Sequence, residues 1–471
     1  MSIPKIIHQL WIGNKPAPIK LMNTWKEKHP DFEYIYWNEE EFVKRKMVFK
    51  CQDKIDGIEE INGKADILRW EILYKFGGVF LDADSICVEP IDDELLNKKC
   101  FAGWEQEEAR PGLIATGTMG FPPKHPLVKG AIKWILNNEV SQEKAQLMAW
   151  QSVGPGLLTR MYNTGEFSDL YIFPSYTFLP IHLTGKEYNG HSKIYAFQAW
   201  GSTKQSYDNM NNMVLPEQFL TPPKEKSVSV LISSYNTPAK YVKDCLDSIK
   251  NQTGYFNIEL VWINDGSDAL HSKLLKNLLD NFMKLSRFIT LVYEVNETNK
   301  GIGYSLNKGI QICSNELIIK MDSDDIMIKN RIQIQMGFME LNPHIMICGS
   351  QINCFKDDIT NIVSVTNHPQ ILTWEQYKEN PSHWFVNHPS LCYRKSGILE
   401  IGNYDANKSR MTEDFEMALR MLKRFGCVCN IPEPLLYYRL HEKQVTNNGG
   451  IEGRGHWHQI RLKIIDELIN S

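Results

Sequence analysis

The sequence lacks the features that mark membrane, secreted and zinc-binding proteins. No apolar run approaches the roughly 20 residues that cross a bilayer, and the first residues, MSIPKIIHQLWIG, do not form a secretory signal. The ten cysteines are scattered without paired Cys-x-x-Cys knuckles, and the closest two are Cys427 and Cys429. Free thiols in a reducing cytoplasm are therefore expected. The abundance of Ile, Lys and Asn is typical of an AT-rich genome, such as that of a large DNA virus or an endosymbiont-like bacterium. If the gene were viral, the expected compartment would be the cytoplasm of the host.

A strong charge of one sign is also missing. The formal net charge is -4, and such a chain has no general attraction to phosphate backbones, which argues against a nucleic-acid partner. Hydrophobic residues at 42% and charged residues at 23% are ordinary for a globular protein. A length of 471 residues suits two domains rather than one core. The Pro-containing segment LPEQFLTPPKEKS marks the boundary, which predicts domains at residues 1–220 and 227–471.

Strand-like and helix-like patterns alternate in both halves. In the first half, strands are predicted at Lys5 to Leu10 and Phe32 to Trp37, a helix at about Gly63 to Phe76, and a strand at VFLD. In the second half, the strands SVSVLIS, IELVWIN, FITLVYEV and ELIIKMD are separated by helices near 241–250, 270–285 and 302–313. This alternation predicts two α/β domains with mostly parallel sheets, which bind ligands at the carboxyl ends of their strands.

An acid pair stands at one of these strand ends. Asp322 and Asp324 are two residues apart, so an extended backbone directs both carboxylates to one side. Two carboxylates about 5 Å apart repel by a few kcal/mol at an effective dielectric of about 20, which favours a raised pKa or a bound cation. Mn²⁺ or Mg²⁺ could bridge the pair to a diphosphate. The alternative is a solvated acidic turn that caps the following helix.

The segments around this pair resemble glycosyltransferase family 2. VLISSYN, WINDGS, NKGIGYSLNKGI, MDSDD, NHPSLCYRKS, TEDFE and IPEPLLYYRLHEKQV follow the order of that family's landmarks. The resemblance implies a GT-A-type fold and a nucleotide-sugar donor. It places Tyr235 and Asp265 at the uracil and ribose, Asp322 and Asp324 at the ribose and metal, and His441 at the metal. His441 could equally be an ordinary surface histidine.

Asp414 lies where that family keeps its catalytic base. Inversion at the anomeric carbon is a single displacement, so it requires one base on the acceptor side. Asp414 could also be a helix-terminal acid, with Thr412 as the cap. The sequence departs from the family by placing Leu306 before Asn307, where Arg is frequent. Lys308 is the candidate that would contact the donor phosphates in its place, unless it is simply solvated.

The first half resembles the DXD-containing sugar-binding region of glycosyltransferase family 32. The segments that carry this resemblance are IPKIIHQLWIG, KADILRWEILYKFGGVFLDAD and VGPGLLTRMY. It implies a second GT-A-type domain with Asp82 and Asp84 at a metal. Asp66 and Arg69 would face the donor sugar, although residues three apart on a helix also form ordinary salt bridges. Trp11 would stack on uracil, or belong to the core.

Two departures stand out in the first half. Relatives have a late His that helps to close the metal site, whereas here Gln198 stands near that place, and Gln is a poorer ligand. Thr116 or Gly117 replaces an expected Asn. These changes are compatible with weaker metal binding, altered sugar choice or a degenerate site.

The leading hypothesis is a bifunctional enzyme that uses UDP-sugars, with a retaining first half and an inverting second half. A polysaccharide, glycoprotein or glycolipid would be the acceptor. The alternative is a single family-2-like transferase whose first half only binds donor or carbohydrate. A nucleotidyltransferase also needs an α/β sheet and paired acids, but the sequence has no G-x-G-T-R start.

Overall fold

The chain forms two compact units. The structure is a computed structural model that describes residues 2–141, 146–201, 207–219, 226–381, 384–405, 412–441 and 450–470. Unit 1 comprises Met1–Tyr188 and Lys193–Leu220, and unit 2 comprises Asn189–Ser192 and Thr221–Ser471. The predicted boundary segment begins at Leu215, and its residues 220–225 lie outside the described part.

Unit 1 is built on a six-stranded sheet in the order β2-β1-β3-β6-β5-β7. The strands are β1 (Ile6–Leu10), β2 (Glu33–Trp37), β3 (Gly78–Leu81), β5 (Cys100–Gln106), β6 (Arg110–Phe121) and β7 (Leu170–Phe173). β1 pairs in parallel with both β2 and β3, whereas β6 runs antiparallel to β3 and β5. A separate ribbon pairs β4 (Ser85–Cys87) with β8 (Ala196–Gln198) in antiparallel fashion. The parallel strands carry the first acid pair at their carboxyl ends.

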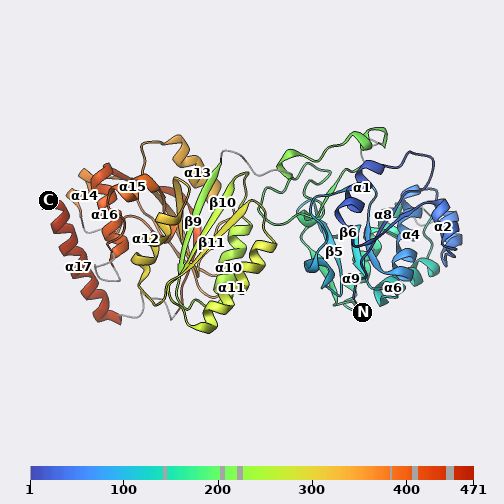
Figure 1. The fold of residues 1–471 in the computed structure, drawn as a ribbon, viewed down its shortest axis with the longest axis horizontal. Coiled ribbons are helices and arrows are strands. Elements are labelled where there is room, and N and C mark those ends of the chain that lie inside the picture. The colour runs from blue at the N-terminus through green and yellow to red at the C-terminus, as the bar shows by residue number, and fades with distance from the viewer. Residues whose placement is uncertain are drawn as a thin grey trace. The chain divides into compact units, whose positions relative to one another are not determined.

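Helices cover the sheet of unit 1, as the blue and green part of Figure 1 shows. They are α1 (Ile19–Lys28), α2 (Glu39–Lys44), α3 (Gln52–Gly57), α4 (Ile61–Phe76), α5 (Asp93–Leu96), α6 (Pro126–Asn137), α8 (Ala149–Ser152) and α9 (Pro155–Asn163), with short 3-10 turns η1 (Ser175–Thr177), η2 (Tyr207–Asn212) and η3 (Glu217–Phe219). Phe80 of β3 joins the cluster under α4 and α6, while its neighbours Val79 and Leu81 join the opposite cluster with Trp25 of α1. The alternation of a strand thus feeds two cores.

Helix α4 ends where the two glycines begin. Gly77 has φ 65° and donates its N–H to Leu73, which is the left-handed ending that glycine adopts without strain. A Cβ on Gly77 would lie 2.6 Å from the backbone nitrogen of Pro123. The glycine pair therefore turns the chain from α4 straight into β3 and fixes where the acid pair emerges.

Unit 2 contains a ten-stranded sheet whose main path is β11-β10-β9-β12-β17-β14-β18-β13. The strands are β9 (Ser227–Ser234), β10 (Asn257–Asn264), β11 (Ile289–Val295), β12 (Leu317–Asp322), β13 (Ile326–Met327), β14 (Ile347–Phe355), β15 (Ile362–Val365), β16 (Ile371–Thr373), β17 (Cys392–Arg394) and β18 (Cys427–Arg439). β11, β10, β9 and β12 are parallel, and β17 runs antiparallel to β12 and β14.

Helices lie on both faces of this sheet. They are α10 (Ala239–Lys250), α11 (Ala269–Lys284), α12 (Ile302–Ile312), α13 (Arg331–Leu341), α14 (Trp374–Glu379), α15 (Lys395–Glu400), α16 (Glu413–Phe425) and α17 (Gly450–Asn470), with the turn η4 (His388–Ser390). Val230 packs into the core shared with α10, α11 and α13, while the next residue, Leu231, packs into the core shared with α12, α15, α16 and α17. The yellow to red part of Figure 1 shows α10 beside α11.

The α/β class predicted from the sequence is confirmed in both units. The predicted helix at about Gly63 to Phe76 is α4, and the strand VFLD is β3, with Asp82 directly after it. Both sheets are mixed, because antiparallel strands extend the parallel groups that the sequence pattern revealed. None of the helices within the described ranges has the length and apolar character needed to cross a membrane.

Candidate active sites

The first acid pair follows β3. Asp82 comes directly after the strand and Asp84 stands two residues later. β3 lies parallel to β1, so residues that follow these strands reach one edge of the sheet, and Trp11 follows β1 there. The backbone N–H of Asp82 donates to the carbonyl oxygen of Gly117 at 2.8 Å. The acid pair is thus held at the edge where parallel α/β sheets bind ligands.

Arg69 ties Asp82 to helix α4. Its Nη2 lies 2.6 Å from Asp82 Oδ1, and its Nη1 lies 3.1 Å from Asp66 Oδ1. Nη1 also donates to the carbonyl oxygen of Thr116 at 2.7 Å, and the guanidinium lies over the Phe80 ring at 4.8 Å. The side chain of Arg69 is 8% exposed. The ordinary helical ion pair with Asp66 is therefore present, and the same guanidinium also joins α4 to the acid pair.

Two glycines give the acids of this site their room. A Cβ on Gly117 would lie 2.8 Å from Asp82 Oδ2, and a Cβ on Gly154 would lie 2.2 Å from Asp66 Oδ2. Gly154 belongs to the segment VGPGLL, and Gly117 to ATGTMG. The sequence pattern gave no reason for glycine at either place, because the carboxylates approach from distant parts of the chain.

Gln198 completes the first site. It ends β8, where it pairs with Ser85 of β4, one residue beyond Asp84. Its Nε2 donates to Asp84 Oδ1 at 2.5 Å and lies 3.5 Å from Asp82 Oδ2, while the N–H of Gly201 donates to Asp84 Oδ2 at 2.7 Å. The residue near the expected His position thus reaches both carboxylates.

Two carboxyl groups of the first site have raised pKa values. Burial raises the pKa of the Asp66 carboxyl to about 6, against the opposing pull of Arg69. Burial, and then the neighbouring charge of Asp82, raise the pKa of Asp84 to about 6. Carboxyl groups in this condition gain from a nearby cation, because it stabilises the ionised form.

Trp11 packs against a small core and also makes a polar contact. Its ring packs against the small core formed by residues such as Leu21, Ile86 and Phe197, and it is only partly buried. Its indole N–H donates to the carbonyl oxygen of Lys15 at 2.7 Å. The ring is therefore fixed at the binding edge of the sheet, and stacking on a uracil stays a prediction.

The second acid pair ends β12 and has a buried lysine beside it. Lys320 and Asp322 are two apart on the strand and so share a face, and Lys320 Nζ lies 2.5 Å from Asp322 Oδ1. The lysine side chain is 1% exposed and the aspartate side chain is 28% exposed. Lys320 was not among the predicted site residues, although a lysine two residues before the acid in an otherwise apolar strand is a signal that the sequence contains.

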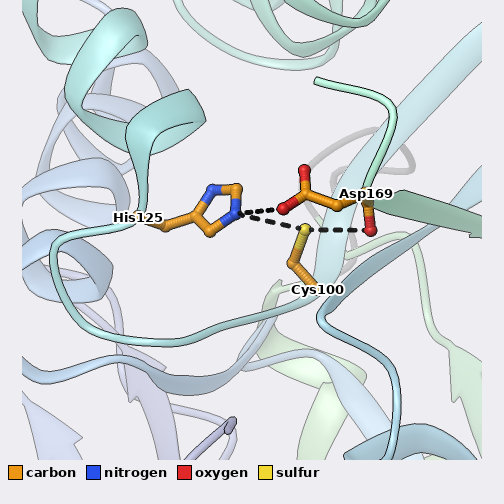
Figure 2. Close-up of side chains that lie close together, drawn as sticks. All are labelled: Cys100, His125 and Asp169. Atoms are coloured by element: carbon orange, nitrogen blue, oxygen red, sulfur yellow. Dashed lines mark hydrogen bonds and ion pairs between the residues drawn. The ribbon is translucent and has the colours of Figure 1, made fainter. Parts of the chain in front are cut away.

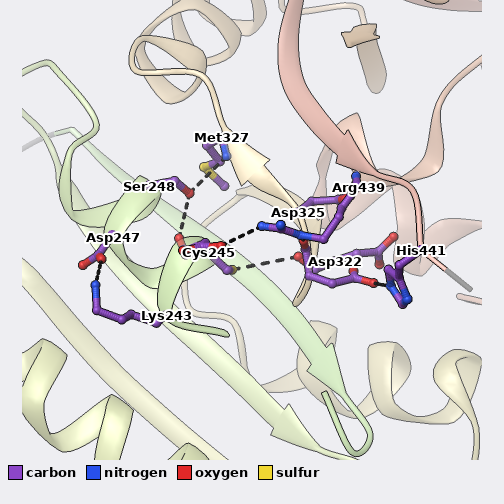
Figure 3. Close-up of polar contacts among 11 residues, drawn as sticks. Lys243, Cys245, Asp247, Ser248, Asp322, Asp325, Met327, Arg439 and His441 are labelled. Carbon is purple, nitrogen blue, oxygen red and sulfur yellow. Dashed lines mark hydrogen bonds and ion pairs between the residues drawn. The ribbon is translucent and has the colours of Figure 1, made fainter. Parts of the chain in front are cut away.

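His441 and Arg439 contact the residues Asp322–Asp325, which carry the second acid pair and are called the acid loop below. His441 Nε2 lies 2.9 Å from Asp324 Oδ2, and Arg439 Nε donates to the backbone oxygen of Asp324 at 2.8 Å. The backbone N–H of Arg439 donates to Asp325 Oδ1 at 2.9 Å, and its Nη2 lies 2.9 Å from Asp244 Oδ2. Figure 3 shows β18 bringing Arg439 and His441 against the acid loop. Asp325 is fully buried, which raises its pKa.

Tyr235 and Asp265 follow adjacent parallel strands, β9 and β10. Tyr235 is 52% exposed, whereas Asp265 is 3% exposed. The Asp265 carboxylate accepts hydrogen bonds from Asn296 Nδ2 and from the backbone N–H groups of Lys300 and Gly301, at 2.8 to 2.9 Å. Asp265 therefore shapes the loop before α12, and its contact with a base or ribose stays a prediction.

Lys308 and Asn307 of α12 are both engaged within the unit. Lys308 Nζ lies 3.1 Å from Glu294 Oε2, and 3.3 Å from Asn296 Oδ1. Asn307 makes two hydrogen bonds with the backbone of Tyr404, at 2.7 and 2.9 Å. Leu306, which stands in place of the family's Arg, is fully buried in the core. Lys308 is thus paired with a carboxylate rather than solvated alone, and its contact with phosphate stays a prediction.

Asp414 lies in the first turn of α16 and accepts a hydrogen bond from the N–H of Phe415 at 2.7 Å. Burial raises its pKa, and among the charges that act on it are Lys320 and Asp322 of the acid-loop strand. Its neighbour Glu413 is buried, and burial raises the pKa of Glu413 to about 7. Thr412 makes no capping hydrogen bond with its side chain. A carboxyl of raised pKa is suited to accept a proton.

The donor atoms of both sites suit a divalent cation. Carboxylate oxygens are common to both, an amide is added by Gln198, and an imidazole is added by His441. In each site the added group already touches the second Asp of the pair. The residues therefore fit the Mn²⁺ or Mg²⁺ that the families imply.

A different cluster lies at the amino ends of β5 and β7 in unit 1, and Figure 2 shows its three side chains. Within the described residues, Cys100, His125 and Asp169 bring ligand atoms within 4.8 Å of one another. His125 Nδ1 accepts the N–H of Leu127 at 3.3 Å, so the neutral ring carries its proton on Nε2, which faces Asp169 Oδ2 at 3.3 Å. Burial raises the pKa of Cys100 to about 12. The contacts of this cluster tie the start of α6 to the start of β7.

Comparisons with known proteins assign the two halves. The profile "Glycosyl transferase family 2" matches residues 229–399, and the profile "Glycosyltransferase sugar-binding region containing DXD motif" matches residues 17–102. The first match contains Asp322 and Asp324, and the second contains Asp82 and Asp84. Asp414, His441, Trp11 and Gln198 lie outside the matched residues.

The chain is also similar to individual glycosyltransferases. O-antigen biosynthesis glycosyltransferase WbnJ of Escherichia coli is 30% identical over 229 residues, which cover 47% of this chain and 82% of the relative. UDP-Gal:alpha-D-GlcNAc-diphosphoundecaprenol beta-1,3-galactosyltransferase of Escherichia coli is 29% identical over 48% of this chain and 78% of the relative. The structure of S. aureus TarS 1-349 in complex with UDP-GlcNAc is 15% identical, with a TM-score of 0.40 over 52% of this chain and 72% of that one.

The matched profiles, the bacterial relatives and the two acid pairs at strand ends lead to one conclusion. The chain is a glycosyltransferase that belongs to glycosyl transferase family 2 through its C-terminal half and carries a DXD-containing sugar-binding region in its N-terminal half.

Proposed function

We propose that the chain is a bifunctional glycosyltransferase with one active site in each half, both using UDP-sugars. The first half would transfer its sugar with retention and the second half with inversion. The observation that carries this proposal is the parallel construction of the two sites. In each site, the first Asp of the pair forms an ion pair with a buried basic side chain, Arg69 or Lys320. The second Asp contacts a residue at or just after the end of a strand late in that half, Gln198 or His441.

In the second half, Asp324 and His441 would hold the divalent cation, and Asp322 would face the ribose. The bound cation supplies positive charge for the departing diphosphate. Lys320 orients Asp322 through the ion pair at its Oδ1, which leaves the other carboxylate oxygen for a hydroxyl. Because Arg439 fixes the backbone of Asp324, the two acids keep their spacing when a donor binds.

Asp414 would be the base of the second half. The acceptor hydroxyl oxygen forms a bond to the anomeric carbon while the bond from that carbon to the diphosphate oxygen breaks. The hydroxyl proton passes to Asp414, and the nucleoside diphosphate leaves with the electron pair of the broken bond. One displacement inverts the anomeric centre, so an α-linked donor gives a β-linked product. The raised pKa of Asp414 supports this role, because a stronger base takes the proton more readily.

In the first half, Asp82 and Asp84 would hold the cation, and Arg69 with Asp66 would face the donor sugar. Retention follows from the resemblance to family 32, with the departing phosphate taking the acceptor proton on the same face of the sugar. Arg69 is suited to contact donor oxygens because its guanidinium is always charged and carries several N–H donors.

One relative is named for UDP-Gal and a beta-1,3 linkage, which supports UDP-linked donors. Glycans, glycoproteins and glycolipids are the proposed acceptors.

Stereochemistry tests the proposal. An Asp82→Asn, Asp84→Asn protein should form only β linkages, and an Asp322→Asn, Asp324→Asn protein only α linkages, as read from anomeric couplings in NMR with a gluco- or galacto-configured donor. Excess EDTA should stop both reactions. Full turnover in EDTA, or one anomer from both proteins, would count against the proposal.

A second candidate has one specific observation in its favour. Gln198 stands where relatives keep His, so the first half could bind a donor or carbohydrate without transferring it. In that case the Asp82→Asn, Asp84→Asn protein would lose no activity. Loss of all activity in that protein would instead show that the halves are coupled or that they act in sequence on one acceptor.

A further inference from the structure

The two acid pairs are closed by side chains of different chemistry. Gln198 reaches Asp84 from the end of β8, and His441 reaches Asp324 from the residues that follow β18. Each contacts the second Asp of its pair, and each lies more than 100 residues along the chain from that Asp. The two side chains therefore occupy equivalent places in the two halves.

The amide of Gln198 can offer an oxygen to a cation. Its Nε2 donates to Asp84 in this structure, and its nearest neighbours are carboxylate oxygens. A half-turn of the amide plane exchanges Nε2 for Oε1 in nearly the same volume, so the group can donate to the carboxylates or coordinate a cation between them. The backbone pairing of Gln198 with Ser85 keeps the side chain at this place.

His441 offers a nitrogen in the second half. Its Nε2 lies 2.9 Å from Asp324 Oδ2, and its ring lies 5.3 Å from the Tyr241 ring at a tilt of 44°. No rotation of an imidazole produces an oxygen donor. Carboxylate and carbonyl oxygens suit Mg²⁺, whereas imidazole nitrogen favours later divalent metals such as Co²⁺.

We infer that Gln198 and His441 give the two halves different metal preferences, with the oxygen-only first site favouring Mg²⁺ relative to the second site and the second site favouring Co²⁺ relative to the first. The inference rests on the proposed function, because it assumes that both acid pairs hold a cation. It makes Gln198 a determinant of metal choice rather than a sign of a degenerate site. The two reactions of one chain would then respond differently to the metals available to it.

The ratio of affinities is the quantity to measure. Overall affinity also depends on net charge, which differs between the sites, whereas the ratio of Co²⁺ to Mg²⁺ affinity cancels that difference. One-site proteins are obtained from the full chain with Asp322→Asn, Asp324→Asn or with Asp82→Asn, Asp84→Asn. Equilibrium dialysis with UDP gives both affinities, and the visible absorption of Co²⁺ reports nitrogen coordination independently of activity.

The expected Co²⁺ to Mg²⁺ ratio is about tenfold higher for the second site than for the first, a typical effect of changing one ligand. Gln198→His should raise the ratio of the first site, and His441→Gln should lower that of the second. If the buried Gln198→His variant does not fold, His441→Gln carries the test, because His441 follows the end of its strand. Equal ratios that neither exchange moves would overturn the inference. A one-site protein that binds neither metal would overturn the proposed function of that half, and the inference with it.

Discussion

The first acid pair is held by an arginine from a helix, and the second by a lysine from the strand itself. Arg69 reaches Asp82 only because α4 packs beside β3, and it also bonds Asp66 and Thr116. Lys320 reaches Asp322 because residues two apart on a strand share a face. The ion pair of the first site thus depends on tertiary packing, whereas that of the second site depends on local strand geometry. We therefore expect the first site to be more sensitive to substitutions elsewhere in the unit.

The two halves also differ in what lies near the acid pair. In unit 2, Asp414 of α16 carries a raised pKa and is acted on by Lys320 and Asp322. In unit 1, the buried carboxyl of Asp66 is bonded to Arg69 instead. The second half therefore has a candidate base for a single displacement, whereas the first half has the Asp66–Arg69 ion pair beside its acid pair.

The largest expected effect separates the halves through this base. Asp414→Asn should lower kcat for β-linked product by roughly 10² to 10⁴, because a positioned base contributes about that much. UDP affinity measured by calorimetry should stay within about twofold, since the role proposed for Asp414 is on the acceptor side. The α-linked product of the same protein is the internal control. A loss of UDP affinity would assign Asp414 to the donor side or to the fold.

Removal of the basic side chain that pairs with the first Asp of each site should have the next largest effect. Arg69→Met or Lys320→Met leaves an aspartate without its partner, and we expect roughly 30-fold weaker UDP binding in that half. This corresponds to about 2 kcal/mol, which is below the usual value for buried pairs because the aspartates are partly exposed. Calorimetry on one-site proteins measures it. Lys276→Met, in an exposed pair with Asp280, is the control and should leave binding unchanged. If one substitution weakened UDP binding equally in both halves, the contrast drawn between the two ion pairs would be wrong.

The buried acid of unit 2 should appear as a pH-dependent loss of stability. Because burial raises the pKa of Glu413 from 4.5 to about 7, the unfolded chain loses its proton first as pH rises between these values. Stability therefore falls across this range and the penalty is complete above pH 7. Glu413→Gln should stabilise the protein at pH 8 by about 3 kcal/mol and leave it unchanged at pH 4 in urea unfolding. Exposed Glu379→Gln is the control. A gain at pH 4 of the same size would mean that packing, not charge, is responsible.

The smallest effect concerns the room around Asp82. Gly117→Ala places a Cβ 2.8 Å from Asp82 Oδ2, and the carboxylate can rotate away at a cost of about 1 kcal/mol. We expect the rate of α-linked product formation to fall several-fold with little change in melting temperature. Gly57→Ala, which meets nothing within 4 Å, is the control. An unchanged rate would show that Asp82 tolerates a shift and that the first site is looser than its contacts indicate.

The sequence by itself determined the α/β class and the two acid pairs, because hydrophobic alternation and strand ends are local properties. Helix α4, strand β3 and the parallel strands of unit 2 follow from residues close together in the chain. It could also have shown Lys320, which lies two residues before Asp322. Only the tertiary structure decided that Gln198 reaches Asp84, that Gly154 makes room for Asp66, and that Arg439 fixes the acid loop. These contacts join residues more than 80 positions apart, and no local pattern encodes which distant strand will arrive at a given edge.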